Sequence, residues 1–308
     1  MRTLPMFALA LGAIACAGSQ ATAPASVPAS IAPPSVAAAV LVSEIEWEQL
    51  NPARGDASPM AATLWGDRNG SGPTGFLVRF VDGFRSPPHI HNVSYRGVVI
   101  RGGIHNDHPS ADEMWMPAGS FWTQPKGGAH VTAARGNNLA YIEIDEGPYL
   151  VRPVEDAFEC DERPMNVNAS KIVWMDTSRT AWSDQLGITV SAHGSQFAFL
   201  SGDSRNGQPR GILVKLQAGS RGMLRSHGST LRAVVIQGSP EVRLAGDNDV
   251  APTEPGSYVS APAGGSVQFS CKMEKDCILH VRLERRIDED GRNRDRSGAE
   301  HRGQPHSR

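Results

Sequence analysis

Three histidines in the first half of the chain have the spacing of a shared metal site. His89 and His91 are separated by one residue, and His130 follows the turn Pro125-x-Gly127. Side chains alternate along an extended strand, so residues at i and i+2 point to the same face and His89 and His91 can chelate together. Because proline does not fit inside a regular strand, the turn would deliver His130 on a neighbouring strand. The spacing therefore predicts a mononuclear metal site in a small β-barrel.

The donor set restricts the metal only to a group of ions. Three neutral imidazoles leave a divalent ion its full charge, and they suit Fe, Zn, Mn, Ni or Cu without choosing among them. Three protein ligands also leave coordination positions open for water, dioxygen or an anionic substrate. We therefore predict one divalent metal ion as cofactor and a small-molecule ligand or substrate as partner.

The histidine segments resemble the two signature motifs of the cupin superfamily. Those motifs read G-x5-H-x-H-x3,4-E-x6-G and G-x5-P-x-G-x2-H-x3-N. The matching residues are Gly83, His89, His91 and Gly102 or Gly103, followed by Gly119, Pro125, Gly127 and His130. The chain departs from the pattern at two positions, because Tyr95 or Arg96 stands where the family has glutamate and Ala134 where it has asparagine. The resemblance implies a barrel that binds metal through its three histidines.

Two longer runs, residues 88–100 and 117–125, look like a bacterial cupin family related to the anti-sigma-factor (ChrR-like) cupins. That family is mostly a domain of unknown function, so the resemblance implies a fold and a site rather than a reaction.

The chain repeats itself at an offset of 136 residues. Residues 74–80 (TGFLVRF) align with 210–216 (RGILVKL), and residues 96–102 align with 232–238. Self-similarity over this length indicates two copies of one domain, each large enough for its own core. We therefore predict an all-β protein with two tandem cupin barrels of the double-stranded β-helix, or jelly-roll, type.

The second copy has lost most of the predicted ligands. Arg225 stands opposite His89 and Val267 opposite His130, so that only His227 remains. An arginine and a valine cannot coordinate a divalent ion, so we predict a metal-free second barrel in which His227 is hydrogen-bonded and partly buried. The other histidines have no ligand-like spacing and are expected to be surface or hydrogen-bonded residues: His105, His108, His193, His280, His301 and His306.

Tyr95 and Gln124, like His89 and His130, are replaced by other residues in the second copy. Leu231 and Ala261 occupy their positions in the second copy, whereas Arg96 persists as Arg232. We therefore predict that Tyr95 is a weak fourth ligand or a hydrogen-bonding partner of the site, and that Gln124 lines the pocket mouth. The alternative is that both are ordinary barrel residues. The persistence of Arg96 indicates a structural ion pair or a solvent-facing role.

The N-terminus has the pattern of an export signal. Arg2 precedes an apolar stretch from Met6 to Ala15 that is too short to span a bilayer. Cys16 follows Ala-Ile-Ala, which resembles a relaxed bacterial lipobox, so lipid attachment at Cys16 and ordinary cleavage nearby both stay open. We predict an exported protein, either periplasmic, secreted or anchored as a lipoprotein, with membrane contact only through a lipid at Cys16.

These features divide the chain into six segments. The predicted boundaries are a signal peptide over 1–17, a flexible Ala/Pro/Ser linker over 18–42, an N-terminal metal-binding cupin over 43–153, a connector over 154–170, a degenerate C-terminal cupin over 171–287 and a disordered tail over 288–308.

Composition agrees with a turn-rich all-β globular protein. The chain has 32 glycines and 22 prolines, and its net charge of −2 gives no reason to expect nucleic-acid binding. In an oxidising compartment Cys271 and Cys277 are expected to form a disulfide across a polar turn. Cys160 is then expected to have a free thiol. A homo-oligomer is compatible with the sequence but not specified by it.

Two classes of function follow. The first is an enzyme, an Fe(II)-type dioxygenase of a small oxygenated organic substrate, as the resemblance to three-histidine cupins that cleave diketones or hydroxyketones implies. In this hypothesis His89, His91 and His130 hold the ion, while Tyr95 or Gln124 orients the substrate. The alternative is a non-catalytic ligand-binding or sensing cupin with a structural metal, as the similarity to anti-sigma-factor cupins implies.

Overall fold

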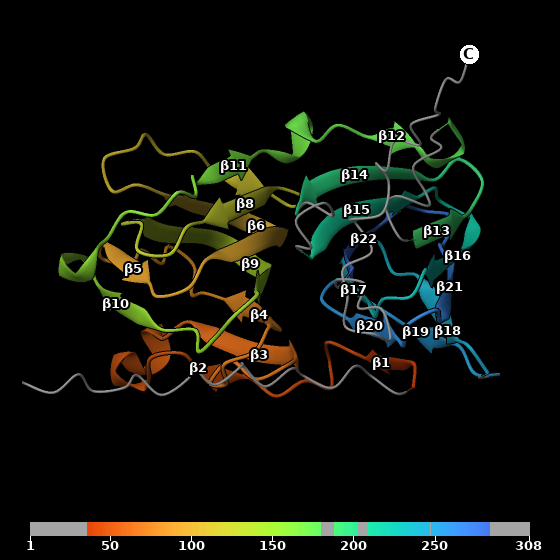
Figure 1. Ribbon diagram of the computed structural model, residues 1–308, viewed down its shortest axis with the longest axis horizontal. Helices are drawn as coiled ribbons and strands as arrows, with labels where there is room; N and C mark the ends of the chain where they lie inside the picture. The colour runs from red at the N-terminus through yellow and green to blue at the C-terminus, as the bar shows by residue number, and fades with distance from the viewer. Residues whose placement is uncertain (1–35, 180–187, 203–208, 247, 284–308) are drawn as a thin grey trace, which may run out of the picture.

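The computed structural model describes residues 36–179, 188–202, 209–246 and 248–283, which form two β-barrels lying side by side (Figure 1). The predicted signal peptide, Cys16 and the C-terminal tail lie outside the described residues. Within the described part, no helix is long and apolar enough to cross a membrane. Its helical segments are short 3-10 turns, namely η1 (Pro52–Ala57), η2 (Val154–Asp156), η3 (Ala169–Lys171) and η4 (Thr177–Arg179).

The first barrel is built around two long strands, β6 (Tyr95–Asp107) and β9 (Val131–Ile144), which pair antiparallel over most of their length. Its large sheet has the order β11-β8-β6-β9-β4-β3-β2, with β7 beside β6, and a small sheet joins β10 to β5. The other strands are β2 (Glu48–Gln49), β3 (Met60–Trp65), β4 (Thr74–Arg79), β5 (His89–His91), β7 (Met116–Pro117), β8 (Phe121–Gln124), β10 (Val151–Pro153) and β11 (Met165–Val167).

The second barrel consists of two sheets, with the orders β1-β20-β17-β22-β15-β14-β12 and β13-β16-β21-β18-β19. Its strands are β1 (Ala38–Val40), β12 (Met175–Asp176), β13 (Ile188–Ser191), β14 (Gln196–Ser201), β15 (Arg210–Leu216), β16 (Arg221–Ser226), β17 (Leu231–Gln237), β18 (Glu241–Leu244), β19 (Ala251–Pro252), β20 (Tyr258–Ala261), β21 (Ser266–Ser270) and β22 (Cys277–Leu283).

Equivalent residues of the two copies occupy equivalent places in their sheets. Tyr95 pairs with Gln124 between β6 and β8, and their counterparts Leu231 and Ala261 pair between β17 and β20. The predicted repeat of one domain is therefore confirmed at the level of strand register.

The barrels share an apolar interface in addition to their separate cores. On β22, Leu279 and Val281 face the core of the second barrel, whereas Ile278 belongs to a cluster that also contains Leu139 and Tyr141 of β9. Both faces of these central strands are buried. Side chains alternate across a strand, so one set points into its own barrel and the other set points toward the partner barrel.

Polar residues on the same strands form a buried ion-pair cluster across the interface. Arg282 of β22 lies 3.3 Å from a Glu143 carboxylate oxygen and 2.8 Å from an Asp145 oxygen. Arg96 completes the cluster with a 2.5 Å contact to Asp145 and a 3.5 Å contact to Glu143. Of the two roles predicted for Arg96, the structure shows the structural ion pair. His280, expected to be at the surface or hydrogen-bonded, is buried here with its ring 5.2 Å from that of Tyr141.

The structure corrects the predicted boundaries at two points. Residues 38–40, assigned to a flexible linker, form β1, which pairs with β20 of the second barrel and so crosses to the far domain (Figure 1). Residues 165–167, assigned to the connector, form β11 on the edge strand β8 of the first barrel. Edge strands leave backbone groups unpaired, and short flanking segments satisfy them here.

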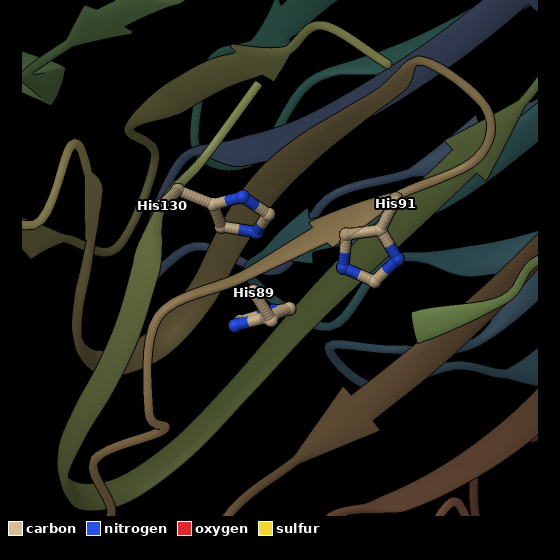
Figure 2. A group of neighbouring side chains, drawn as sticks. All are labelled: His89, His91 and His130. Atoms are coloured by element: carbon tan, nitrogen blue, oxygen red, sulfur yellow. The ribbon is translucent and has the colours of Figure 1, made fainter. Parts of the chain in front are cut away.

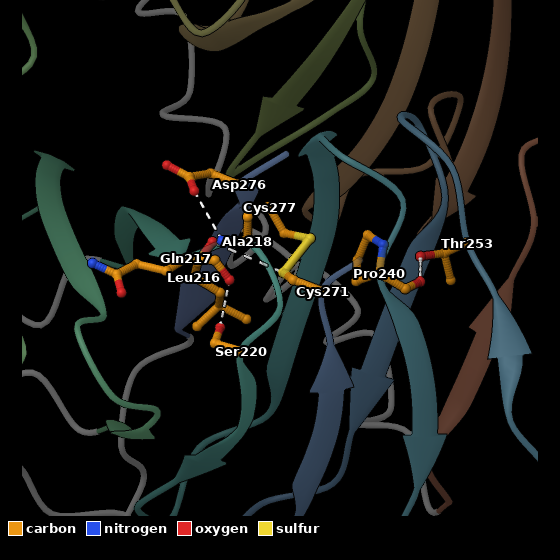
Figure 3. Close-up of a disulfide and its surroundings, with 9 residues drawn as sticks. All are labelled: Leu216, Gln217, Ala218, Ser220, Pro240, Thr253, Cys271, Asp276 and Cys277. Carbon is orange, nitrogen blue, oxygen red and sulfur yellow. Dashed lines mark hydrogen bonds between the residues drawn. A yellow bond between two sulfur atoms is a disulfide. The ribbon is translucent and has the colours of Figure 1, made fainter. Parts of the chain in front are cut away.

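Cys271 and Cys277 form the expected disulfide, with their Cα atoms 6.0 Å apart (Figure 3). It closes the turn between β21 and β22, and Asp276 in that turn accepts a hydrogen bond from the Ala218 backbone N–H at 2.9 Å. Cys160 is the free cysteine of the described residues, as expected.

Candidate metal centre

The structure brings His89, His91 and His130 together on one wall of the first barrel (Figure 2). His89 and His91 project from the same face of β5, and His130 directly precedes β9. His89 and His130 are opposite each other in an antiparallel bridge, with two backbone hydrogen bonds of 3.0 Å. One ring nitrogen from each histidine lies within 4.8 Å of the others, so the three could hold one metal ion.

The predicted turn positions His130. Gly127 has a φ of 72° and donates its backbone N–H to the His91 carbonyl at 2.8 Å, which ties the turn to the ligand strand. A Cβ at Gly127 would lie 2.5 Å from the Phe158 carbonyl oxygen, so both the left-handed backbone and the close approach require glycine there. The turn residues and the ligands thus form one local unit.

Backbone carbonyls fix the orientation of all three imidazoles. The Nδ1 atoms of His89, His91 and His130 lie 3.0, 3.1 and 3.0 Å from the carbonyl oxygens of Pro87, Leu150 and Gly128. A carbonyl only accepts hydrogen bonds, so each Nδ1 carries the proton and each Nε2 keeps its lone pair. Metal-binding histidines characteristically have such a second partner, and the three side chains therefore fit a metal ion.

Burial keeps the three imidazoles neutral. It lowers the pKa of His130 to about 3, lowers the pKa of His91 well below its usual range and lowers the pKa of His89. Repulsion between the neighbouring rings lowers the pKa values of His91 and His130 further. Because only a neutral imidazole can coordinate, the site is ready for a metal across the neutral pH range.

We expect the metal-free protein to lose stability as the pH falls below about 6.5. Unfolded imidazoles titrate near that value, so at lower pH the unfolded chain binds more protons than the folded chain. For His130, with a folded pKa of about 3, the loss amounts to about 2 kcal/mol at pH 5. Urea unfolding of chelator-treated protein at pH 7.5 and pH 5 measures it. His130→Gln should show a smaller pH dependence, and an equal dependence would contradict this prediction.

Tyr95 faces the site from the position where the cupin motif has glutamate. Its hydroxyl lies 3.3 Å from His130 Nε2 and donates a hydrogen bond to Asn106 Oδ1 at 3.0 Å. Thr132 donates to the same Asn106 oxygen at 2.8 Å. Burial raises the pKa of Tyr95, so the residue is a neutral phenol. Its proton goes to the nearer acceptor, Asn106, which leaves the His130 lone pair for a metal.

Gln124 lies behind the pocket wall and not at its mouth, where it was predicted. It is buried, accepts a hydrogen bond from the Asn106 amide at 3.1 Å and donates one to the Gly128 carbonyl at 3.0 Å. It lies on β8 directly opposite Tyr95 and contacts Asn106 through its side-chain oxygen. Gln124 can therefore influence the site by holding Asn106, whereas Tyr95 lines the cavity itself.

Tyr95→Phe is expected to keep the fold, because its ring packs in the apolar core of the first barrel. Loss of the hydroxyl should weaken metal or substrate binding roughly 10–100-fold, the range for residues that contact metal ligands. Competition with a metal-sensitive dye measures the affinity, and thermal unfolding checks the fold. An affinity equal to that of the wild type for both metal and ligand would make Tyr95 an ordinary barrel residue.

The sequence reasoning missed Tyr149, whose ring stacks on His91 at 4.4 Å and an interplanar angle of 21°. Its hydroxyl lies 3.3 Å from His91 Nε2. Asn92 holds the segment by donating to the Pro148 carbonyl and accepting from the Leu150 N–H, both at 2.9 Å. Position 149 lies past the part of the repeat that aligned, so comparing the copies gave no signal for it.

Asn106 and Thr132 were also missed, although the repeat carried a signal for them. They pair across β6 and β9, and the equivalent pair between β18 and β21 is Val242 and Phe269. Both polar residues thus become apolar in the copy without the histidine triad, as Tyr95 does.

Apolar side chains fill the corresponding space in the second barrel. Leu231, Val242, Val267 and Phe269 all belong to its buried core. His227 is half-buried, and its Nε2 lies 2.6 Å from the Thr189 hydroxyl oxygen, which confirms the predicted hydrogen bond. Of the histidines without ligand-like spacing, His105 is buried and its Nδ1 accepts a hydrogen bond from the Met114 backbone N–H at 3.3 Å. Its Nε2 has no hydrogen-bond partner among the described residues, so the predicted hydrogen bonding is found at one ring nitrogen.

A cavity of about 610 Å³ adjoins the triad. His89, His91, Tyr95 and Tyr149 line it on the metal side, and most of the remaining wall is apolar or aromatic. An open metal site next to a largely apolar cavity is an arrangement in which a small molecule can be bound and transformed.

The fold and the site define a two-barrel cupin with a candidate metal centre in its first barrel. Among solved structures, the chain resembles a candidate dioxygenase from Nostoc punctiforme, with a TM-score of 0.59, 14% identity and coverage of 82% of this chain and 84% of that chain. It also resembles an oxalate decarboxylase from Lactobacillus farciminis, with a TM-score of 0.53, 10% identity and coverage of 82% and 87%. Hazelnut (Corylus avellana) vicilin has a TM-score of 0.51, 12% identity and coverage of 80% and 85%. At these identities the likeness establishes the fold alone.

Residues 38–289 match the family described as DUF4437, a domain of unknown function, and the chain belongs to that family. The match covers both barrels and begins at β1, so the family domain is the complete two-barrel unit. A search of curated proteins gave no match.

Proposed function

We propose that this chain is an exported, metal-dependent dioxygenase that acts on a small oxygenated organic substrate. The observation that carries the proposal is the convergence of three neutral imidazoles, with one ring nitrogen of each within 4.8 Å of the others, beside a largely apolar cavity. The similar Nostoc protein is a candidate dioxygenase, which makes this the first reaction to test. Export, with either cleavage or lipid attachment near Cys16, is proposed from the N-terminal sequence.

Each residue of the site has a separate task in this proposal. His89, His91 and His130 would hold an iron(II) ion, which supplies the redox chemistry that lets dioxygen react with an organic molecule. Tyr95 lines the cavity beside His130 with a neutral hydroxyl that donates to Asn106, so its oxygen can accept a hydrogen bond that orients a bound substrate. Tyr149 packs over His91 and restricts water access to that ligand. Both atoms of dioxygen enter the product, so the substrate itself supplies the electrons.

The test is oxygen uptake by protein loaded anaerobically with iron(II). Small ketones, hydroxyketones and phenols form the substrate panel, and His89→Ala treated in the same way sets the background. Uptake above this background with at least one compound supports the proposal. A chain that binds metal but shows no such uptake would instead be a ligand-binding or sensing cupin, the role to which a relation with anti-sigma-factor cupins would point.

A further inference from the structure

The ionisable side chains around the cavity favour a negatively charged ligand. Apart from the imidazoles and tyrosines, the titratable groups that line it are Glu48, Arg54 and Arg68. Arg68 and Glu48 form an ion pair and neutralise each other. Arg54 lies over the Phe84 ring at 5.3 Å, and no carboxylate among the described residues is within ion-pair distance of it. One cationic group is therefore left at the cavity in addition to the charge of a metal.

Arg54 lines the same cavity as His89 and His91. Three neutral ligands would leave a divalent ion its two charges, so a group between the ion and Arg54 faces only positive charge. An anionic group is strongly favoured in such a place because its hydrogen bonds are charge-assisted.

The remainder of the cavity fits an apolar body. Its wall includes Phe76, Phe80, Phe84 and Ile142, and its volume of about 610 Å³ lies in the range that holds drug-sized ligands.

We propose that the cavity selects organic carboxylates with an aryl or branched alkyl body, the acid group facing Arg54 and the three-histidine site and the body packing on the aromatic wall. This inference names the substrate class of the proposed function and rests on that function. It predicts weaker binding of short hydrophilic acids, which leave the wall uncovered, and of neutral molecules, which leave Arg54 without a charged partner.

The experiment uses the full chain loaded with zinc, which binds without turning over a substrate. Calorimetry compares 4-phenylbutyrate with butyrate, which lacks the ring, and with 4-phenylbutan-1-ol, which lacks the charge. We expect 4-phenylbutyrate to bind at least about tenfold more tightly than either. Arg54→Gln should weaken its binding roughly three- to tenfold, as expected for a partly exposed charge pair, and leave the alcohol unaffected. Arg79→Gln is the matched control, because Arg79 lies over Trp47 at 4.2 Å and does not line the cavity.

Equal binding of acid and alcohol, equal effects of Arg54→Gln and Arg79→Gln, or no binding of any probe to fully zinc-loaded protein would each overturn the proposal. Zinc content is measured first, because it distinguishes a failure of the metal site from a failure of the proposed substrate class. Protein that takes up no zinc overturns the metal site and this inference together. Zinc-loaded protein that does not bind 4-phenylbutyrate overturns the substrate class alone. The oxygen-uptake experiment then still tests the proposed reaction.

Discussion

Replacing either His89 or His130 by alanine is expected to reduce bound metal from about one divalent ion per chain to nearly none. The site has three imidazole donors within 4.8 Å of one another, and no carboxylate or thiolate joins this group among the described residues. Two remaining imidazoles cannot retain the ion through desalting, because no nearby side chain can take over as a third strong ligand. Elemental analysis after loading with zinc or iron(II) and desalting measures the stoichiometry.

His227→Ala is the matched control for these variants. It removes the histidine that occupies the position of His91 in the second barrel, so it should leave the metal content unchanged. Thermal unfolding shows whether each variant remains folded, which matters most for His130 because its ring is completely buried. The metal site is wrong if both first-barrel variants retain as much metal as the wild type.

The parts of the site that could be predicted from sequence depend on short-range geometry. His89 and His91 share a face because of strand alternation, and the Pro125–Gly127 turn lies only a few residues from the histidine it positions. The repeat supplied the long-range information that single motifs lack. It distinguished residues that shape the barrel, which both copies keep, from residues such as Tyr95 that only the copy with the triad keeps.

The parts that could not be predicted depend on contacts between distant segments. Tyr149 reaches His91 through the arrangement of a loop that the repeat does not cover. The pairing of β1 with β20 joins segments from opposite ends of the chain. The alternation on β9 and β22 was recognisable, but a polar face on a strand normally indicates solvent. Here Glu143 and Arg282 occupy those polar faces and meet each other in the barrel interface.

Arg282→Met is expected to destabilise the full chain by roughly 3–5 kcal/mol, the typical cost of removing one partner from a buried ion pair. The Arg282 side chain is 1% exposed and the Glu143 side chain 3% exposed, so neither charge has access to water. Burial alone would raise the pKa of Glu143, but the positive charge of Arg282, with smaller contributions from His280 and Arg96, holds it below its usual range. Without Arg282, Glu143 still has the longer contact with Arg96 and a hydrogen bond from Tyr141 at 3.3 Å.

Urea unfolding compares the stability lost on removing this buried arginine with the stability lost on removing an exposed one. Arg85→Met is the matched control, because Arg85 and Glu113 form a 2.6 Å pair with both side chains about half exposed, and its removal should cost less than about 1 kcal/mol. Equal costs for the two variants would show that the interface pair is not desolvated. Combining Arg282→Met with Glu143→Leu should recover most of the lost stability, because the uncompensated charge is then removed and Arg96 remains paired with Asp145. A double variant as unstable as Arg282→Met alone would assign the loss to packing between the barrels and not to the buried carboxylate.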